Sequence, residues 1–266
     1  MKPGRDGPAW LRWAGPAVVG LAFLLAWHLF VVVKGIPRYI VPSPVLVLET
    51  LWRDWPLLSR SLLVTLEITG LALFFSVLLG TLLSFLFVQS RTIEASLLPY
   101  AVILQVTPII AIAPLVIIWV KEPLPALVIC ATVAAIFPVI SNTTMGLKSV
   151  DPALADLFRM YGASRLQVLL RLRIPSAAPY FFAGLKVAAA LALIGAVVAE
   201  FVAGTGGTES GLAYQILMAG LQLNIPRLFA ALLLITAAGI ALFLAASLLS
   251  WLALRHWHES EVTREI

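Results

Sequence analysis

The segment LADLFRMYGASRLQVLLRLRIPSAAPYF (Leu154–Phe181) places four arginines in an amphipathic pattern between long apolar runs. Apolar residues recur at helical spacing before its central glycine, at Leu154, Leu157, Phe158 and Tyr161, and form one stripe. A charged segment with a central glycine and two prolines near its end is unusual between two hydrophobic runs. It predicts helices that lie outside the bilayer but remain attached to membrane spans.

The residues around the stripe predict where two short helices begin and end. Asp151 before Pro152 is an N-cap acceptor followed by proline at the first helical position. Gly162 is placed to end the first helix in the left-handed conformation. Ser164 and Gln167 then form a capping-box pattern for a second helix.

We expect Pro175 to end the second helix and Pro179 to open the following span. Helices this short are not stable alone in water, so their apolar stripes need a partner surface. The sequence pattern leaves two partners open, namely lipid headgroups and another protein.

The composition of the whole chain identifies an integral membrane protein. Of 266 residues, 61% are hydrophobic and only 12% are charged, whereas soluble domains carry about 25% charged residues. The expected fold is all-α, a polytopic bundle of transmembrane helices. The single cysteine, Cys130, lies in an apolar run and can form neither an intramolecular disulfide nor a metal cluster.

Six spans are expected, because a helix needs about 20 apolar residues to cross the bilayer core. They are Pro16–Val33, Leu62–Val88, Leu97–Val120, Leu124–Ile140, Phe182–Ala203 and Pro226–Leu254. The fourth is short and could join the third as a re-entrant hairpin around Val120–Pro125, which would leave five. The first run lacks a small-residue cleavage site, which favours a retained helix over a signal peptide.

The distribution of lysine and arginine predicts that both termini are cytoplasmic. With that orientation the cytoplasmic segments carry Lys2, Arg5, Arg12, Arg91, Lys148, Arg159, Arg165, Arg171, Arg173, Lys186, Arg255 and Arg264. The external segments carry half as many, Lys34, Arg38, Arg53, Arg60, Lys121 and Arg227. In the first external segment, Val45, Leu48, Leu51, Trp52 and Trp55 recur at helical spacing and predict a helix along the membrane surface.

A resemblance to a known family covers most of the chain. The order of Asp156, Arg159, Gly162-Ala163-Ser164, Ile174-Pro175 and Pro179 resembles the cytoplasmic EAA loop of binding-protein-dependent ABC importer permeases. The segments Tyr39–Leu51, Thr107–Trp119, Phe137–Leu154 and Gly184–Gly204 resemble the nitrate/sulfonate/taurine branch of that family. Tyr161–Arg165 and Leu212–Ile235 are most similar to permeases for vitamin-related heterocycles such as pyrimidine precursors or riboflavin.

The resemblance implies the fold of a type I importer permease, with a transmembrane domain at residues 16–254 and short cytoplasmic ends, 1–15 and 255–266. It implies a coupling loop at 141–181 that meets the ATPase through Asp156, Leu157, Phe158, Arg159, Tyr161, Gly162, Ala163 and Ser164. The family triplet usually reads Glu-Ala-Ala, whereas this chain has Asp156-Leu157-Phe158.

The resemblance also implies partners and a location. They are a second copy of the chain, two ABC ATPase subunits that bind ATP and Mg²⁺, and an external substrate-binding protein. The location is the bacterial inner membrane, and nucleic acid is not a partner. The solute would be a vitamin-related heterocycle, or a nitrate- or sulfonate-like anion.

Motifs for catalysis within this chain are missing. No GxxxxGK[ST] motif is present, and the glycine-rich Gly204–Gly211 lacks its lysine, so we interpret it as an external turn. Neither HExxH nor a G-x-S-x-G elbow occurs. The alternatives are a secondary transporter, which would need an inverted repeat and intramembrane ion-binding groups, and a membrane enzyme.

Polar groups within spans are candidates for the substrate path because burying them in lipid is costly. They are Glu67, Gln105 and Glu200, with Thr107 beside Gln105 and His28 in the first span as a weaker candidate. Glu200 ends a face of small residues made by Ala188, Ala192, Gly195, Ala196 and Ala199. We expect that face to pack on the same helix of a second copy.

Overall fold

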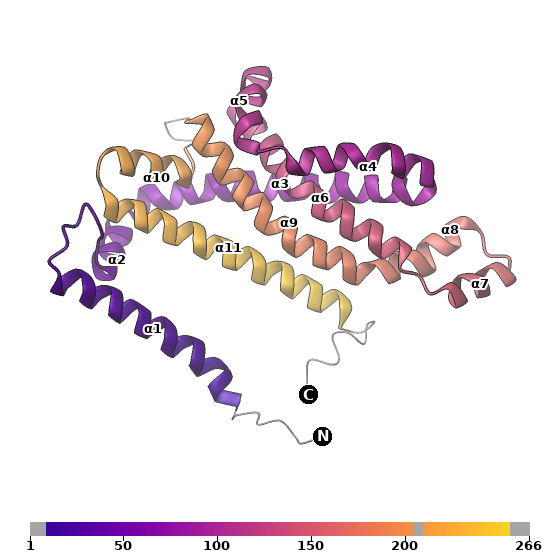
Figure 1. The fold of residues 1–266 in the computed structure, drawn as a ribbon, viewed down its shortest axis with the longest axis horizontal. Helices are drawn as coiled ribbons and strands as arrows, with labels where there is room; N and C mark the ends of the chain where they lie inside the picture. The colour runs from indigo at the N-terminus through magenta and orange to yellow at the C-terminus, as the bar shows by residue number, and fades with distance from the viewer. Residues whose placement is uncertain (1–8, 205–209, 256–266) are drawn as a thin grey trace. The chain divides into compact units, whose positions relative to one another are not determined.

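The computed structural model describes residues 9–204 and 210–255, and all regular structure within these ranges is helical (Figure 1). The expectation of an all-α fold is therefore confirmed for the described residues. The helices are α1 (Ala9–Val33), α2 (Pro44–Arg53), α3 (Trp55–Gln89), α4 (Arg91–Val106), α5 (Ile109–Val120), α6 (Pro123–Lys148), α7 (Pro152–Met160), α8 (Arg165–Val168), the π-helical turn η1 (Leu169–Arg173), α9 (Ile174–Ala203), α10 (Leu212–Leu221) and α11 (Ile225–Leu254).

Five helical segments among the described residues are long and apolar enough to cross a membrane. They lie in α1, α3, α6, α8–η1–α9 and α11, and the bent pair α4–α5 makes a sixth span if counted as one. The expected spans therefore correspond to the helices, although several boundaries differ. The Gly204–Gly211 turn lies mostly outside the described residues.

The third expected span is broken in its middle. The axes of α4 and α5 differ by 99° across Thr107 and Pro108. Thr107 is extended, with φ −72° and ψ 121°, as is favoured for a residue before proline. Pro108 also lacks the N–H that would continue the helix. The span expected at Leu97–Val120 is therefore present as a bent pair of helices and not as one continuous helix.

The fourth span is longer than expected, because α6 continues past Ile140 to Lys148. The resemblance places the start of the coupling loop at residue 141, but residues 141–148 belong to α6, in which Thr143 and Thr144 are buried. The Asn142 side chain donates to the Pro138 carbonyl at 2.9 Å and so stays within its own helix. Polar side chains can be satisfied inside a helical bundle, so the change in composition did not mark the end of the helix.

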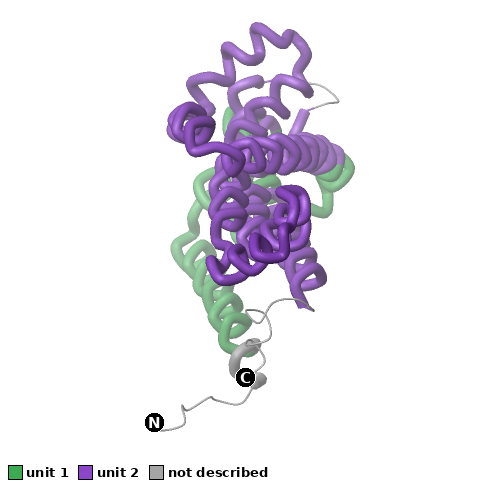
Figure 2. Tube along the Cα trace, turned by 90° about the vertical axis from the view of Figure 1, so that its right-hand side faces the viewer, with its two compact units in different colours: residues 1–59, 215–233 green, residues 60–214, 234–266 purple. Residues whose placement is uncertain are grey.

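The chain divides into two compact units (Figure 2). Unit 1 comprises residues 1–59 and 215–233. The expected helix is present as α2, which is capped by Ser43 and buries Val47 and Thr50, although Trp55 lies outside it and begins α3. Its apolar residues Val45, Leu48 and Trp52 remain exposed, and Arg227 pairs with Asp54 at 2.7 Å in the same unit.

Unit 2 comprises residues 60–214 and 234–266, and small residues form its core between α3, α6 and α9. The whole Ala188–Ala199 face is buried on α6, alongside which α9 runs in Figure 1. A Cβ at Gly195 would lie 2.9 Å from Cα of Ala131 in α6. The expectation that this face packs on a second copy is wrong, because α6 of the same chain already covers it.

Hydroxyl groups link α3 to α6 in the same core. Ser76 donates to the Thr132 carbonyl at 3.2 Å, and Ser84 donates to the Ile140 carbonyl at 3.0 Å. Small and hydroxylated residues let helix backbones approach closely where lipid gives no hydrophobic drive for helix association.

Pro175 does not end a helix, contrary to expectation, and Pro179 lies inside α9. The backbone passes from α8 through η1 into α9, and the Ile174 N–H bonds the Leu169 carbonyl five residues earlier. The wider π-turn accommodates a proline ring that would clash with the carbonyl four residues back in an ordinary helix. The span formed by α9 is therefore continuous with the charged segment before it.

Candidate functional site

The α6–α9 loop (Ser149–Arg173) is held in shape by local hydrogen bonds. Asp151 caps α7, and its Oδ1 accepts the Ala153 N–H at 2.8 Å. At the other end, the Gly162 N–H bonds the Arg159 carbonyl and the Ala163 N–H bonds the Phe158 carbonyl, both at 3.0 Å. This pair of bonds is a Schellman motif, and it requires the left-handed φ of +66° at Gly162.

The second helix begins with the expected capping box. Ser164 Oγ accepts the Gln167 N–H at 3.3 Å, and Gln167 Oε1 accepts the Ser164 N–H at 2.7 Å. The turn and both helix starts predicted around Gly162 are therefore confirmed.

The apolar stripe of α7 has no cover within the described part of the chain. Leu154 and Leu157 are each almost half exposed, and Tyr161 is 83% exposed. Phe158 is half-buried and lines a small groove with Leu157 and Tyr161. Asp156 and Arg159 form an exposed ion pair at 2.9 Å on the same helix. The stripe is thus an exposed apolar surface among charges, suited to a protein contact.

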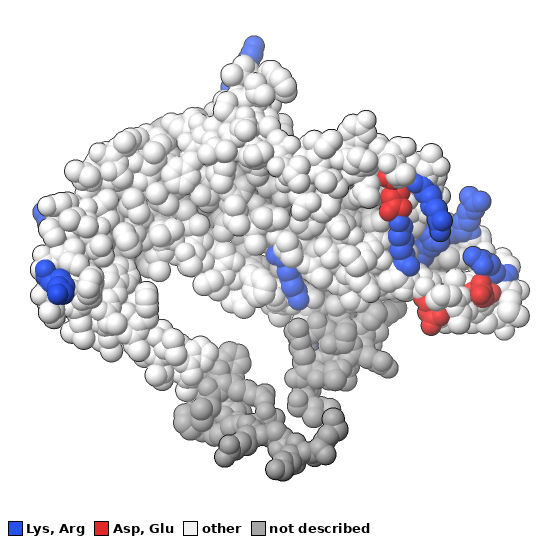
Figure 3. Space-filling model, viewed as in Figure 1, with Lys and Arg blue, Asp and Glu red and all other residues white. Residues whose placement is uncertain are grey.

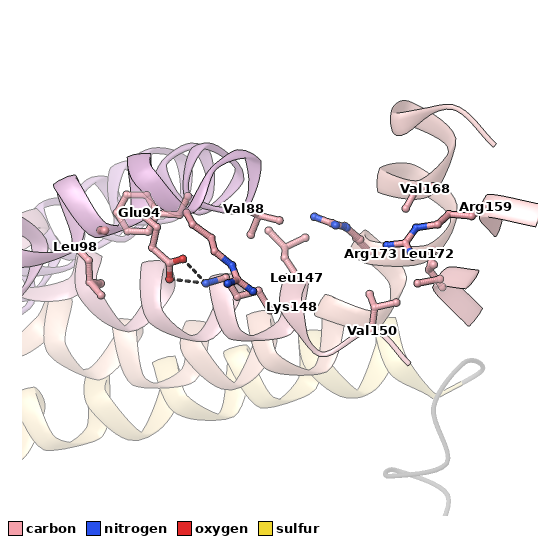
Figure 4. Close-up of a pocket in the computed structure, with 14 residues that line it drawn as sticks. Val88, Glu94, Leu98, Leu147, Lys148, Val150, Arg159, Val168, Leu172 and Arg173 are labelled. Atoms are coloured by element: carbon pink, nitrogen blue, oxygen red, sulfur yellow. Dashed lines mark hydrogen bonds and ion pairs between the residues drawn. The ribbon is translucent and has the colours of Figure 1, made fainter. Parts of the chain in front are cut away.

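A cavity of about 840 Å³ lies between this loop and the adjoining ends of α3, α4 and α6 (Figure 4). Charged side chains gather at this end of the molecule, over α4, α7 and α8 (Figure 3). Lys148 of α6 pairs with Glu94 of α4 at the cavity wall. This cavity could not be predicted from the sequence, because its walls come from segments far apart in the chain.

The three expected intramembrane path residues differ in their exposure. Glu67 in α3 and Gln105 in α4 are exposed. Glu200 in α9 is only 3% exposed. Thr107 bonds the Ile103 carbonyl of its own helix, and His28 is half-buried in unit 1.

Glu200 joins three segments of unit 2. Its Oε2 accepts the Ala213 N–H at the start of α10 at 3.0 Å. The adjacent Leu212 N–H bonds Thr65 Oγ1 of α3 at 2.9 Å, and Gly211 packs so closely on the carboxylate that a Cβ there would overlap it. Glu200 thus acts as a cap for α10, where the positive end of the helix favours a carboxylate. Whether it also meets substrate stays a prediction.

Comparison with protein families decides the class of the chain. Residues 72–256 match the family described as the binding-protein-dependent transport system inner membrane component. The chain belongs to this family of ABC importer permeases. The resemblance inferred from the loop is thereby confirmed. The chain is a multi-pass inner-membrane component of an importer and not its catalytic subunit.

Relatives support the assignment along nearly the whole permease. A probable ABC transporter permease of Haemophilus influenzae is 33% identical, covering 91% of this chain and 96% of its own. The formylaminopyrimidine transport permease ThiX of Halalkalibacterium halodurans is 33% identical, covering 86% of this chain and 90% of its own. The riboflavin transport system permease RibX of Chloroflexus aurantiacus is 32% identical, covering 92% and 91%.

A solved structure has the same fold. The inward-facing MetNI methionine ABC transporter matches with a TM-score of 0.65 and 18% identity, over 74% of this chain and 96% of that one. The type I importer fold expected for the permease is therefore confirmed.

Proposed function

We propose that two copies of this permease join two ATPase subunits, each through α7, and pass inward a solute delivered by an external binding protein. ATP and Mg²⁺ would be bound by the ATPases. Closure of the ATPases would move the α6–α9 loops, and the spans would follow because η1 continues into α9 without a break.

The observation that carries this proposal is the uncovered stripe of α7. A helix of nine residues is not stable alone in water, yet α7 is capped at both ends and buries none of its residues. Its exposed Leu154, Leu157 and Tyr161 therefore require an external surface. The family assignment supports an ATPase groove as that surface.

Two substitutions at Gly162 test the proposal. A Cβ at Gly162 meets nothing within 4 Å, so any effect comes from its backbone conformation. Valine disfavours positive φ, whereas asparagine tolerates it. Gly162→Val should abolish ATPase activity stimulated by the loaded binding protein in reconstituted importer, and Gly162→Asn should retain most of it. Equal activity of the two variants would contradict the role of this turn in coupling.

The broken span α4–α5 supports a location for the substrate path. Irregular backbone at membrane depth is tolerated only where protein or water covers it, and the break lies at Thr107 and Pro108. Exposed Gln105 lies two residues before it, and exposed Glu67 also needs protein or water. We place Gln105 and Glu67 along the path at the interface of the two copies. Glu200 would act there by fixing α10.

The substrate we propose is a small aromatic heterocycle related to a vitamin. Support comes from the two relatives named for formylaminopyrimidine and for riboflavin. Mass spectrometry of the ligand carried by the partner binding protein tests this directly. A nitrate- or sulfonate-like anion in place of a heterocycle would overturn the proposal about substrate while leaving the importer role intact.

We also propose that both termini are cytoplasmic, which places the α6–α9 loop on the ATPase side. The support is the charge bias, with twice as many basic residues on the proposed cytoplasmic side. In a Cys130→Ala background, cysteine at Ser164 should react with impermeant thiol reagents only from the cytoplasm. Cysteine at Lys121 should react only from outside, and the reverse pattern would overturn the orientation.

A further inference from the structure

The 840 Å³ cavity combines two kinds of wall. One wall is apolar and contains buried Phe87, Leu147 and Leu172. The other is basic and contains Arg91, Lys148, Arg159 and Arg173. Figure 4 shows Arg173 extending from the loop toward Leu147 and Val88. The cavity therefore suits a molecule with an anionic part and an apolar part.

The positive charge of the cavity is only partly neutralised by protein. Lys148 pairs with Glu94, and Arg159 pairs with Asp156. Arg91 and Arg173 also line the cavity, and no acidic partner is found for either of them among the described residues. The guanidinium groups of Arg91 and Arg173, beside an apolar wall, are thus available to bind an anion. Guanidinium groups match phosphate geometry especially well, because their planar fork donates two parallel hydrogen bonds.

The position of the cavity identifies the source of that anion. Its walls are the ends of three membrane helices, where α3 stops at Gln89, α4 starts at Arg91 and α6 stops at Lys148. At such ends a phospholipid presents its phosphate beside its apolar chains. Basic pockets at the cytoplasmic ends of transmembrane helices bind anionic headgroups.

We propose that this cavity binds the headgroup of an anionic phospholipid, with Arg91 and Arg173 on the phosphate and the apolar wall against the glycerol and acyl region. The lipid would contact α4 on one side and η1 on the other. It would therefore join the α3–α4 hairpin to the α6–α9 loop and stabilise one position of that loop. The site involves the inner side of α7, through Ala155, and so leaves the exposed stripe free.

The test measures lipid binding by the intact permease. Wild-type protein in detergent receives phosphatidylglycerol or phosphatidylcholine, and native mass spectrometry and thermal unfolding report the bound lipid. Phosphatidylglycerol should stay bound and raise the unfolding temperature, whereas phosphatidylcholine should not. Each of Arg91→Gln and Arg173→Gln should weaken phosphatidylglycerol binding by about tenfold, because one charge-assisted contact is lost.

Arg165→Gln is the matched control, since Arg165 is exposed on the same loop but does not line the cavity. It should bind phosphatidylglycerol like the wild type. Arg91 is exposed, so Arg91→Gln should fold even if Arg173→Gln does not. Unchanged lipid binding in Arg91→Gln would overturn the proposal. Equal stabilisation by inorganic phosphate would also overturn it, because the site would then take the free anion.

Discussion

The α6–α9 loop and the α6–α9 helix pair lie next to each other in the chain but obtain their shapes in opposite ways. In the loop, α7 and α8 bury no residue, and bonds between near neighbours fix their ends. In the pair, Ala188, Ala192 and Ala196 are fully buried against partners far away in the sequence. The loop therefore keeps an exposed surface that another molecule can contact, whereas the facing surfaces of α6 and α9 are already buried against each other.

The largest expected effect is in the helix pair. Gly195→Leu should leave little folded permease, because even a Cβ would lie 2.9 Å from backbone of α6 and overpacking by a whole side chain costs more than about 3 kcal/mol. Size-exclusion chromatography of detergent-solubilised protein measures the outcome. Gly20→Leu is the control, since a Cβ at Gly20 meets nothing within 4 Å. A normal elution profile for Gly195→Leu would contradict the close packing.

A smaller effect is expected where Glu200 meets α10. Gly211→Ala should destabilise unit 2 by about 1–3 kcal/mol, because the added methyl group overlaps the carboxylate. Glu200→Ala alone should also destabilise it, since the buried Ala213 N–H loses its acceptor.

The two changes together should cost less than the sum of the separate costs, by at least about 1 kcal/mol, because the clash is gone. Thermal unfolding of the two single variants and the double variant gives this coupling. If the two destabilisations simply add, the Glu200 carboxylate is not what excludes a side chain at position 211.

The smallest effect on stability is expected in the loop. Asp156 and Arg159 are paired but largely exposed, and such pairs contribute about 0.5 kcal/mol or less. Asp156→Asn should therefore leave thermal unfolding unchanged. A fall in stimulated ATPase activity in this variant would then report a contact with the ATPase, and a large loss of stability would show that the pair supports the fold.

The sequence predicted the loop well because its determinants are local. Asp151, Gly162 and the Ser164–Gln167 pair each act within a few residues, so their spacing alone places the helix ends. The same local rule failed at Pro175, because a π-turn before the proline accommodates the ring and the helix continues.

The sequence could not predict which helix packs against the small-residue face of α9. The face ending at Glu200 is suited to close packing on any helix, and only the folded chain shows that α6 covers it. The role of Glu200 as a cap could not be predicted for a similar reason. It depends on contacts with Ala213 and Thr65, and no sequence motif links these residues to Glu200. The basic cavity likewise depends on bringing Arg91 and Arg173 together from separate segments.

The central claim is that the exposed stripe of α7 contacts an ATPase subunit. A photoreactive benzoylphenylalanine at Tyr161, which is 83% exposed, tests it in assembled and active importer. We expect a covalent adduct between permease and ATPase after illumination, and none from the same group at Phe74, which is 60% exposed on the membrane helix α3. Adducts from Tyr161 with lipid or with the permease alone, in complexes that still hydrolyse ATP, would contradict the account.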